Sequence, residues 1–284
     1  MANGCPVASA GGARRLRTMT AKFGESVLIL ASHPDDEIVA CGAAAGRARA
    51  AGTQVWVIYL THGCLDHGTV WPWDRPHHAE KVRRRRAEAA RASKALGLRP
   101  AAWCSRPARW LWRDLPAAER EVRAAIAAHE IDRLWTPAFE GGHPDHDATN
   151  ALASLFVCEG LSVLEFAEYN LASGRPRSHL FPATTGAEQV ITLTPVERAF
   201  KRRALGFYAS ERGNLRRIGV DREVFRPLPN HDYGRPPHPD KLWYSRFHWV
   251  PFRHPRVDFV RPQSVYDEIA EYIDRARGPP FWSA

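Results

Sequence analysis

Two short clusters of histidine and aspartate are the part of this sequence best suited to chemistry. The first reads Ser32-His33-Pro34-Asp35-Asp36-Glu37, and the second reads Gly141-Gly142-His143-Pro144-Asp145-His146-Asp147. Because His33 and Asp36 are three residues apart across a strand-to-helix turn, their side chains can converge on one point. One imidazole from the second cluster would complete a set of two histidines and one carboxylate. A catalytic zinc site with an open fourth position uses this ligand set.

The remaining carboxylate of the first cluster, Asp35, is a candidate general base. Zinc lowers the pKa of a bound water to about 7, so a nearby carboxylate can take its proton. The alternative for each cluster alone is a helix N-cap beside a buried structural histidine. A third triplet, His238-Pro239-Asp240, follows no predicted strand and is interpreted as non-functional. Two clusters at the ends of two strands favour metal binding.

The elements that must position these clusters alternate along the chain. Apolar runs rich in β-formers predict strands over 26–32, 55–61, 101–104, 131–137 and 163–170. Helices are predicted over 38–51, 80–96, 117–129, 146–157 and 195–209. This alternation predicts an α/β, Rossmann-like, doubly wound and mostly parallel sheet. The clusters follow the first and fourth strands, which flank the point where the winding reverses, so we expect them to face each other there.

The sequence predicts a single α/β domain over residues 24–284, preceded by a flexible extension over residues 1–23. The extension carries its arginines after its weakly apolar part, which is the wrong order for a secretory signal, and translation could start at Met1 or Met19. Within the domain, residues 225–284 are predicted to form a cap, irregular because 225–256 are rich in proline and aromatic residues.

Composition narrows the class of protein further. The chain has 284 residues, of which 44% are apolar, as in an ordinary globular protein. No apolar run approaches the ~20 residues of a membrane span. Five cysteines without a C-x-x-C spacing favour a reduced, cytoplasmic setting over a disulfide framework. No G-x-G-x-x-G follows the first strand, which argues against a dinucleotide site.

The charge of the chain is distributed unevenly. The formal net charge is +9, yet residues 25–80 and 124–190, which contain both clusters, carry −4 and −6. The basic remainder could serve nucleic-acid binding, but the sequence contains no known nucleic-acid module. We interpret most of it as arginine-rich surface. A further hypothesis is that Arg85 and the arginines of 198–217 favour a substrate with an anionic group.

The two clusters together resemble a known family. Ala-Ser-His-Pro-Asp-Asp-Glu after the first strand and His-Pro-Asp-His after the fourth are similar to the motifs of the PIG-L/LmbE-like zinc-dependent N-deacetylases. Members of this family remove acetyl groups from N-acetylglucosaminyl conjugates in glycosylphosphatidylinositol, mycothiol, bacillithiol and antibiotic pathways. The resemblance covers about residues 25–211. It implies that His33, Asp36 and His146 bind zinc, with another divalent metal as the alternative.

The resemblance also implies roles for three further residues. Asp35 would be the general base. His143 would be the imidazolium that stabilises the tetrahedral oxyanion and later protonates the leaving amine, and Asp145 would orient His143. Arg85-x-x-Glu88 resembles the family's R-x-x-E helix, whose arginine reaches the substrate; the alternative is a solvated helix face.

Two positions depart from the family pattern. Glu211 stands where glutamine is usual, in a segment that resembles a late family helix. After the second strand the family tends to have Thr-x-Gly-Glu, whereas this chain has Thr61-His62-Gly63-Cys64. The loss of this acid does not involve the implied zinc ligands or base. It bears on the substrate contacts at this edge of the sheet.

Four tryptophans are candidates for substrate contact. They lie in the loops after the second and third strands: Trp71, Trp73, Trp110 and Trp112. Both loops emerge at the carboxyl end of the sheet, where the clusters also lie. Aromatic faces there could stack on a sugar or on an apolar aglycone. The alternative is that these tryptophans pack beneath long loops.

The sequence therefore predicts a metal-dependent hydrolase that removes an acetyl or other small acyl group from an amino-sugar conjugate. One alternative is a related amidase that cleaves a larger acyl or thiol conjugate with the same site. The other is a basic nucleic-acid-binding protein, whose affinity would fall steeply with salt. The expected partner is a small molecule, with no nucleic acid and no membrane span, and the oligomeric state is left open.

Overall fold

The computed structural model describes residues 23–216, 218–249 and 261–277. The predicted extension over 1–23 lies outside these residues apart from Phe23, which is buried in the core. Parts of the predicted cap, 250–260 and 278–284, also lie outside them.

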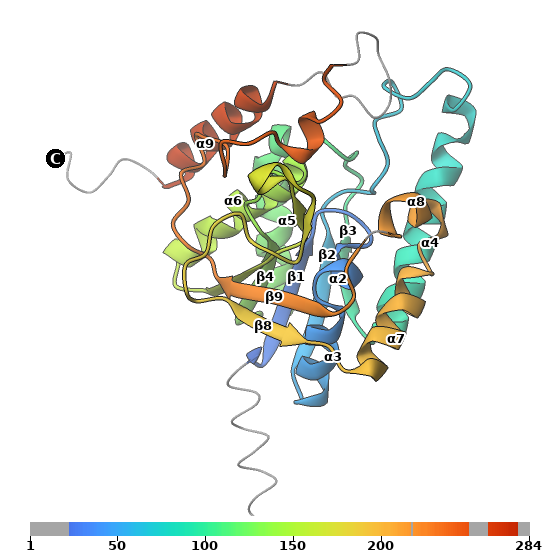
Figure 1. Ribbon diagram of the computed structural model, residues 1–284, viewed down its shortest axis with the longest axis vertical. Coiled ribbons are helices and arrows are strands. Elements are labelled where there is room, and N and C mark those ends of the chain that lie inside the picture. The colour runs from blue at the N-terminus through green and yellow to red at the C-terminus, as the bar shows by residue number, and fades with distance from the viewer. Residues whose placement is uncertain (1–22, 217, 250–260, 278–284) are drawn as a thin grey trace, which may run out of the picture.

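A seven-stranded sheet forms the centre of the molecule, in the order β3-β2-β1-β4-β5-β9-β8 (Figure 1). The strands are β1 Ser26–Ala31, β2 Gln54–Tyr59, β3 Arg99–Trp103, β4 Arg133–Pro137, β5 Ser162–Phe166, β8 Gln189–Thr192 and β9 Arg222–Pro227. The first five are parallel, and β9 and β8 continue the sheet in antiparallel pairs. The predicted α/β fold with a mostly parallel sheet is confirmed.

Helices cover both faces of this sheet. They are α2 Asp36–Val39, α3 Gly42–Ala50, α4 His78–Leu96, α5 Leu115–Ala128, α6 Pro144–Cys158, α7 Pro195–Leu205, α8 Arg212–Leu215 and α9 Pro262–Arg277. Successive side chains of a strand point to opposite faces. Accordingly Leu28 and Leu30 of β1 pack with α5, α6 and α9, whereas Val27 and Ile29 pack with α3, α4 and α7 (Figure 1). β1 is buried along its whole length, which explains its continuous apolar run.

The helix predicted over 38–51 is two helices, α2 and α3, separated at Ala40 and Cys41. The break has a tertiary cause. The buried carboxylate of Glu223, on β9, accepts the backbone N–H groups of Ala43 and Ala44 at 2.9 and 2.8 Å. A carboxylate at a helix amino terminus satisfies donors that have no partner within the helix. Lys201 of α7 donates to the same carboxylate at 2.8 Å.

The strand predicted over 163–170 ends at Phe166, and Tyr169–Asn170 forms a separate short strand, β6, paired with β7 at Arg177–Ser178. The predicted irregular cap contains two regular elements. β9 pairs with β5 inside the sheet, and α9 packs against α6. The apolar residues of α9 recur with helical spacing and are buried: Val265, Tyr266, Ile269 and Ile273.

Candidate metal and active site

The two histidine clusters lie side by side at the carboxyl end of the sheet. β1 and β4 are adjacent and parallel, so the segments that follow them emerge together. His33 Nδ1 lies 3.2 Å from His146 Nε2, which confirms the prediction that the clusters face each other. The second cluster opens α6, where Pro144 occupies the first turn and the His143 ring caps the helix by accepting the Asp145 N–H.

Three side-chain atoms have the spacing of a metal site. His33 Nδ1 and His146 Nε2 are 3.2 Å apart, and Asp36 Oδ1 lies 3.8 Å from the first and 3.6 Å from the second. Ligand atoms around a tetrahedral zinc ion, with bonds of about 2.0–2.1 Å, lie about 3.4 Å from one another. The three predicted ligands therefore fit the metal. Two overlapping groups also converge within 4.8 Å: His33 with His143 and His146, and Asp36 with His146 and Glu168.

The protonation of these ligands follows from their surroundings. Burial would raise the pKa of Asp36, but His146 and His33 lower it below its usual value, which keeps the carboxylate ionised. Burial lowers the pKa of His146 to about 4, which leaves this imidazole neutral. For His33, the effect of burial is overcome by the Asp145 and Asp36 carboxylates, which raise its pKa to about 10. A metal that binds His33 therefore displaces a proton.

Asp35, the predicted base, is held in an unusual conformation beside Arg85. Its φ of 135° lies in the region that non-glycine residues rarely adopt. Burial raises the pKa of its carboxyl group well above its usual range, and Arg85 opposes this effect. Arg85 Nη2 donates to the Pro34 carbonyl at 2.7 Å and lies 3.5 Å from Asp35 Oδ2, while Nη1 lies 3.4 Å from Glu211. Arg85 is thus buried against the first cluster and is not part of a solvated face.

Asp145 is completely buried between the two imidazoles. Its Oδ2 lies 3.0 Å from His33 Nε2 and 3.7 Å from His143 Nδ1, so its closer contact is with His33. The carboxylate also accepts the backbone N–H groups of Arg109 and Leu111. Burial and the nearby His33 lower the pKa of His143 well below its usual value, which favours a neutral ring in these surroundings.

Glu168 is a site residue that the sequence reasoning missed. It follows β5, the strand next to β4, and its side chain is 1% exposed. Its Oε2 lies 4.0 Å from His146 Nδ1. The sequence does contain a signal for this residue, namely an acidic side chain two residues after an apolar strand, at the sheet edge that carries both clusters.

The four candidate tryptophans have different surroundings. Trp71 and Trp73 stack on each other, with ring centroids 5.0 Å apart, and Trp73 is 66% exposed. Trp110 is 36% exposed and lies under the Arg113 guanidinium. Trp112 is 6% exposed and belongs to the core, which favours the packing interpretation for that residue.

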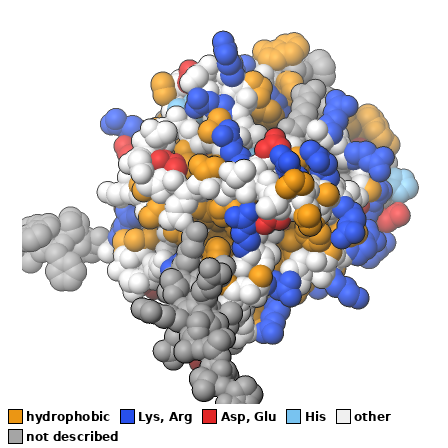
Figure 2. Space-filling view, turned by 60° about the horizontal axis from the view of Figure 1, so that its bottom comes forward, with side chains coloured by type: hydrophobic (Ala, Val, Ile, Leu, Met, Phe, Trp, Pro, Cys, Tyr) orange, Lys and Arg blue, Asp and Glu red, His pale blue; other side chains and the backbone are white. Residues whose placement is uncertain are grey.

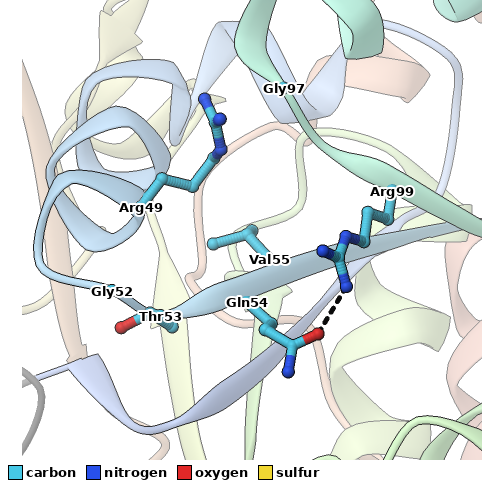
Figure 3. A pocket seen from close by; sticks show the side chains of 7 residues that line it. All are labelled: Arg49, Gly52, Thr53, Gln54, Val55, Gly97 and Arg99. Atoms are coloured by element: carbon cyan, nitrogen blue, oxygen red, sulfur yellow. Dashed lines mark hydrogen bonds between the residues drawn. The ribbon is translucent and has the colours of Figure 1, made fainter.

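A shallow hollow at the opposite end of the sheet is unrelated to this site (Figure 3). It is lined by Arg49, Gly52, Thr53, Gln54, Val55, Gly97 and Arg99, at the amino end of β2. Arg49 donates to the Leu96 carbonyl and Arg99 to Gln54, so both guanidinium groups already have protein acceptors.

Among the described residues, no helix is both long enough and apolar enough to cross a membrane.

The chain is similar to several known proteins. Residues 28–157 match the family model PIG-L, described as GlcNAc-PI de-N-acetylase. A deacetylase of the teicoplanin biosynthesis pathway superposes with a TM-score of 0.58 at 21% identity, over 71% of this chain and 97% of that one. The A40926 pseudoaglycone deacetylase Dbv21 superposes with a TM-score of 0.56 at 20% identity, over 72% of this chain and 96% of that one. The zinc-inhibited form of the teicoplanin deacetylase Orf2 superposes with a TM-score of 0.54 at 18% identity, over 71% of this chain and 97% of that one.

None of the curated proteins matches the chain. At these identities the structural likeness establishes the shared fold. The match to the PIG-L family model covers residues 28–157 and spans both histidine clusters, so this part of the chain is similar to that family.

Proposed function

We propose that this protein is a metal-dependent N-deacetylase that removes an acetyl or other small acyl group from an amino-sugar conjugate. The observation that carries the proposal is the zinc-like spacing of His33 Nδ1, His146 Nε2 and Asp36 Oδ1 beside Asp35 and His143. The family description and the deacetylase titles of the structural neighbours support this reaction class.

His33, Asp36 and His146 would hold the metal, and zinc is the ion that this donor set suits. When bound, the ion would polarise the acyl carbonyl and lower the pKa of water at the open position. One structural neighbour is described as a zinc-inhibited form of the teicoplanin deacetylase Orf2, so zinc is linked to that protein as an inhibitor.

The protein's own groups would move the protons. Asp35 would accept a proton from the attacking water, with Arg85 at 3.5 Å limiting how far its pKa rises. Because His143 Nδ1 accepts the Asp145 N–H, the proton of the neutral ring lies on Nε2. That N–H would donate to the oxyanion. The proton that Asp35 takes from the water would pass to the ring, whose low pKa would make the resulting imidazolium a strong acid toward the leaving amine as the C–N bond breaks. Asp145 would hold His143, as well as the closer His33, in place.

The substrate would bind at the rim formed by the loops after β2 and β3, where Trp71, Trp73 and Trp110 lie. Figure 2 shows Lys and Arg side chains along the side of the molecule where Figure 1 places α4 and α7. The hypothesis of an anionic group on the substrate rests on Arg85, the arginine of α4 that lies against the first cluster. A cytoplasmic location also remains a proposal, supported by free thiols at Cys41, Cys64, Cys104 and Cys158.

Removal of the metal should abolish activity reversibly. We expect protein dialysed against a chelator to release no free amine from N-acetylglucosaminyl conjugates, and stoichiometric zinc to restore the release. A panel that pairs neutral with anionic conjugates at low salt would test the aglycone hypothesis in the same assay. Full activity in metal-free protein would contradict the proposed function.

Substitution of Trp73 by alanine should weaken substrate binding rather than turnover. Loss of an aromatic contact worth about 0.5–1.5 kcal/mol would raise KM by roughly 2–12-fold with little change in kcat. Val196→Ala is a matched control, because Val196 is also exposed (78%) but lies on α7. Steady-state kinetics would distinguish the two variants, and an unchanged KM for Trp73→Ala would remove Trp73 from the substrate site.

A further inference from the structure

The two ring nitrogens of His146 face different neighbours. Nε2 faces His33 Nδ1 at 3.2 Å and Asp36 Oδ1 at 3.6 Å, on the side of the predicted metal. Nδ1 faces Glu168 Oε2 at 4.0 Å. Both side chains are 1% exposed, and in the described part of the chain neither His146 Nδ1 nor Glu168 Oε1 has a hydrogen-bond partner. A buried polar atom without a partner is unfavourable, so these complementary groups mark an incomplete contact.

The neighbouring ligand shows the same contact in its complete form. His33 Nε2 lies 3.0 Å from Asp145 Oδ2, so this carboxylate can keep a proton on Nε2 when a metal displaces the proton on Nδ1, the nitrogen that faces His146. A metal between the two rings requires a lone pair on His146 Nε2 as well. The proton of the neutral His146 ring must then be on Nδ1, from which the Glu168 carboxylate lies 4.0 Å away.

Glu168 is held in this place by a second buried carboxylate. Glu140, which directly precedes the second cluster, accepts the backbone N–H groups of Glu168 and Tyr169 at 2.8 and 2.9 Å. It also accepts the Asn170 side-chain amide at 3.0 Å. The Tyr169 ring packs edge-on against His146, with centroids 5.6 Å apart. The segment after β5 is therefore fixed to the segment after β4, with the Glu168 carboxylate on the outer side of His146.

We propose that Glu168 is a positioning residue that accepts the Nδ1 proton of His146 and thereby keeps Nε2 free for the metal. It would do for His146 what Asp145 does for His33. Ligating histidines commonly donate their second N–H to a carboxylate, which fixes the tautomer and raises the basicity of the ligating nitrogen. The inference rests on the proposed function, because it requires a metal at Asp36 and the two histidines.

Zinc affinity, measured by competition with a chromogenic chelator, tests this role without any activity assay. We expect Glu168→Ala to weaken zinc binding by about 10–100-fold. Glu168→Gln keeps an acceptor oxygen and should lose less. Glu165→Gln is a matched control, because Glu165 is a fully buried carboxylate that pairs with Arg226 of β9 and with His231 rather than with a histidine of either cluster. Its zinc affinity should equal that of the wild type.

Nitrogen-15 NMR of the zinc-loaded protein gives a second readout. In the wild type, the His146 ring proton should be on Nδ1 and its resonance strongly deshielded. In Glu168→Gln this resonance should move upfield. The Glu168→Gln variant keeps the test available even if Glu168→Ala does not fold. An unmoved resonance, or wild-type affinity in Glu168→Ala, would overturn the inference. So would a proton on Nε2 with zinc on Nδ1, because Glu168 would then be a direct ligand. A wild type that binds no zinc would instead refute the proposed function.

Discussion

Replacing Asp35 should leave zinc bound and reduce kcat by about 10²–10⁴-fold, the usual contribution of a positioned general base. The reason is geometric. Asp36 and the two histidines supply the zinc-like triangle, whereas Asp35 lies outside it and contacts Arg85 instead. Loss of the Asp35 carboxylate therefore removes a proton acceptor without removing a ligand.

Two substitutions separate this effect from damage to the backbone. Asp35→Ala deletes the carboxylate, but alanine is poorly suited to a φ of 135°. Asp35→Asn keeps the shape of the side chain and tolerates positive φ better, so its zinc content should match the wild type more closely. The rate of free-amine release from an N-acetylglucosaminyl conjugate, measured on protein of known zinc content, tests the role of Asp35. Wild-type kcat in Asp35→Ala would refute Asp35 as the base.

Replacing His146 by alanine should abolish zinc binding, and activity with it. This change removes one of three ligand atoms, so the loss of affinity should exceed the 10–100-fold effect of an outer carboxylate. The buried carboxylate of Asp36 would also lose a nearby imidazole at 3.6 Å. Metal analysis of the purified variant after equilibration with zinc provides the measurement.

His129→Ala is a suitable control for this experiment. His129 stacks on Trp56, and its carbonyl accepts the hydroxyl of Ser26 at the amino end of β1. Its removal should leave zinc stoichiometry at the wild-type value. One zinc ion bound tightly to His146→Ala would show that the ligand set has been assigned incorrectly.

The features that the sequence predicts correctly are those determined by local pattern. β1 is a continuous apolar run because both faces of a parallel strand are buried, and its end is therefore visible in the sequence. The clusters follow β1 and β4 directly, so the topology of the sheet brings His33 and His146 together. The left-handed Gly97 that ends α4 is likewise where the sequence places the end of that helix.

The features that cannot be predicted from the sequence depend on contacts between distant segments of the chain. The break between α2 and α3 requires Glu223, about 180 residues later in the chain. The early end of β5 requires Glu140 to bind the N–H groups of Glu168 and Tyr169. Glu168 itself belongs to no motif, and its relation to His146 is visible only when β4 and β5 are paired. These residues are buried acids whose partners cannot be inferred from neighbouring positions.

The capping of α3 by Glu223 has a consequence for how the chain acquires its structure. The family match ends at residue 157, yet the amino terminus of α3 is completed only by β9 and by Lys201 of α7. Contacts of such long range form late in folding, because a large loop must close first. A fragment ending at residue 157 would contain both histidine clusters but not the acid that fixes the helix behind the first one. We therefore expect a fragment limited to residues 28–157 to be less stable than the full chain.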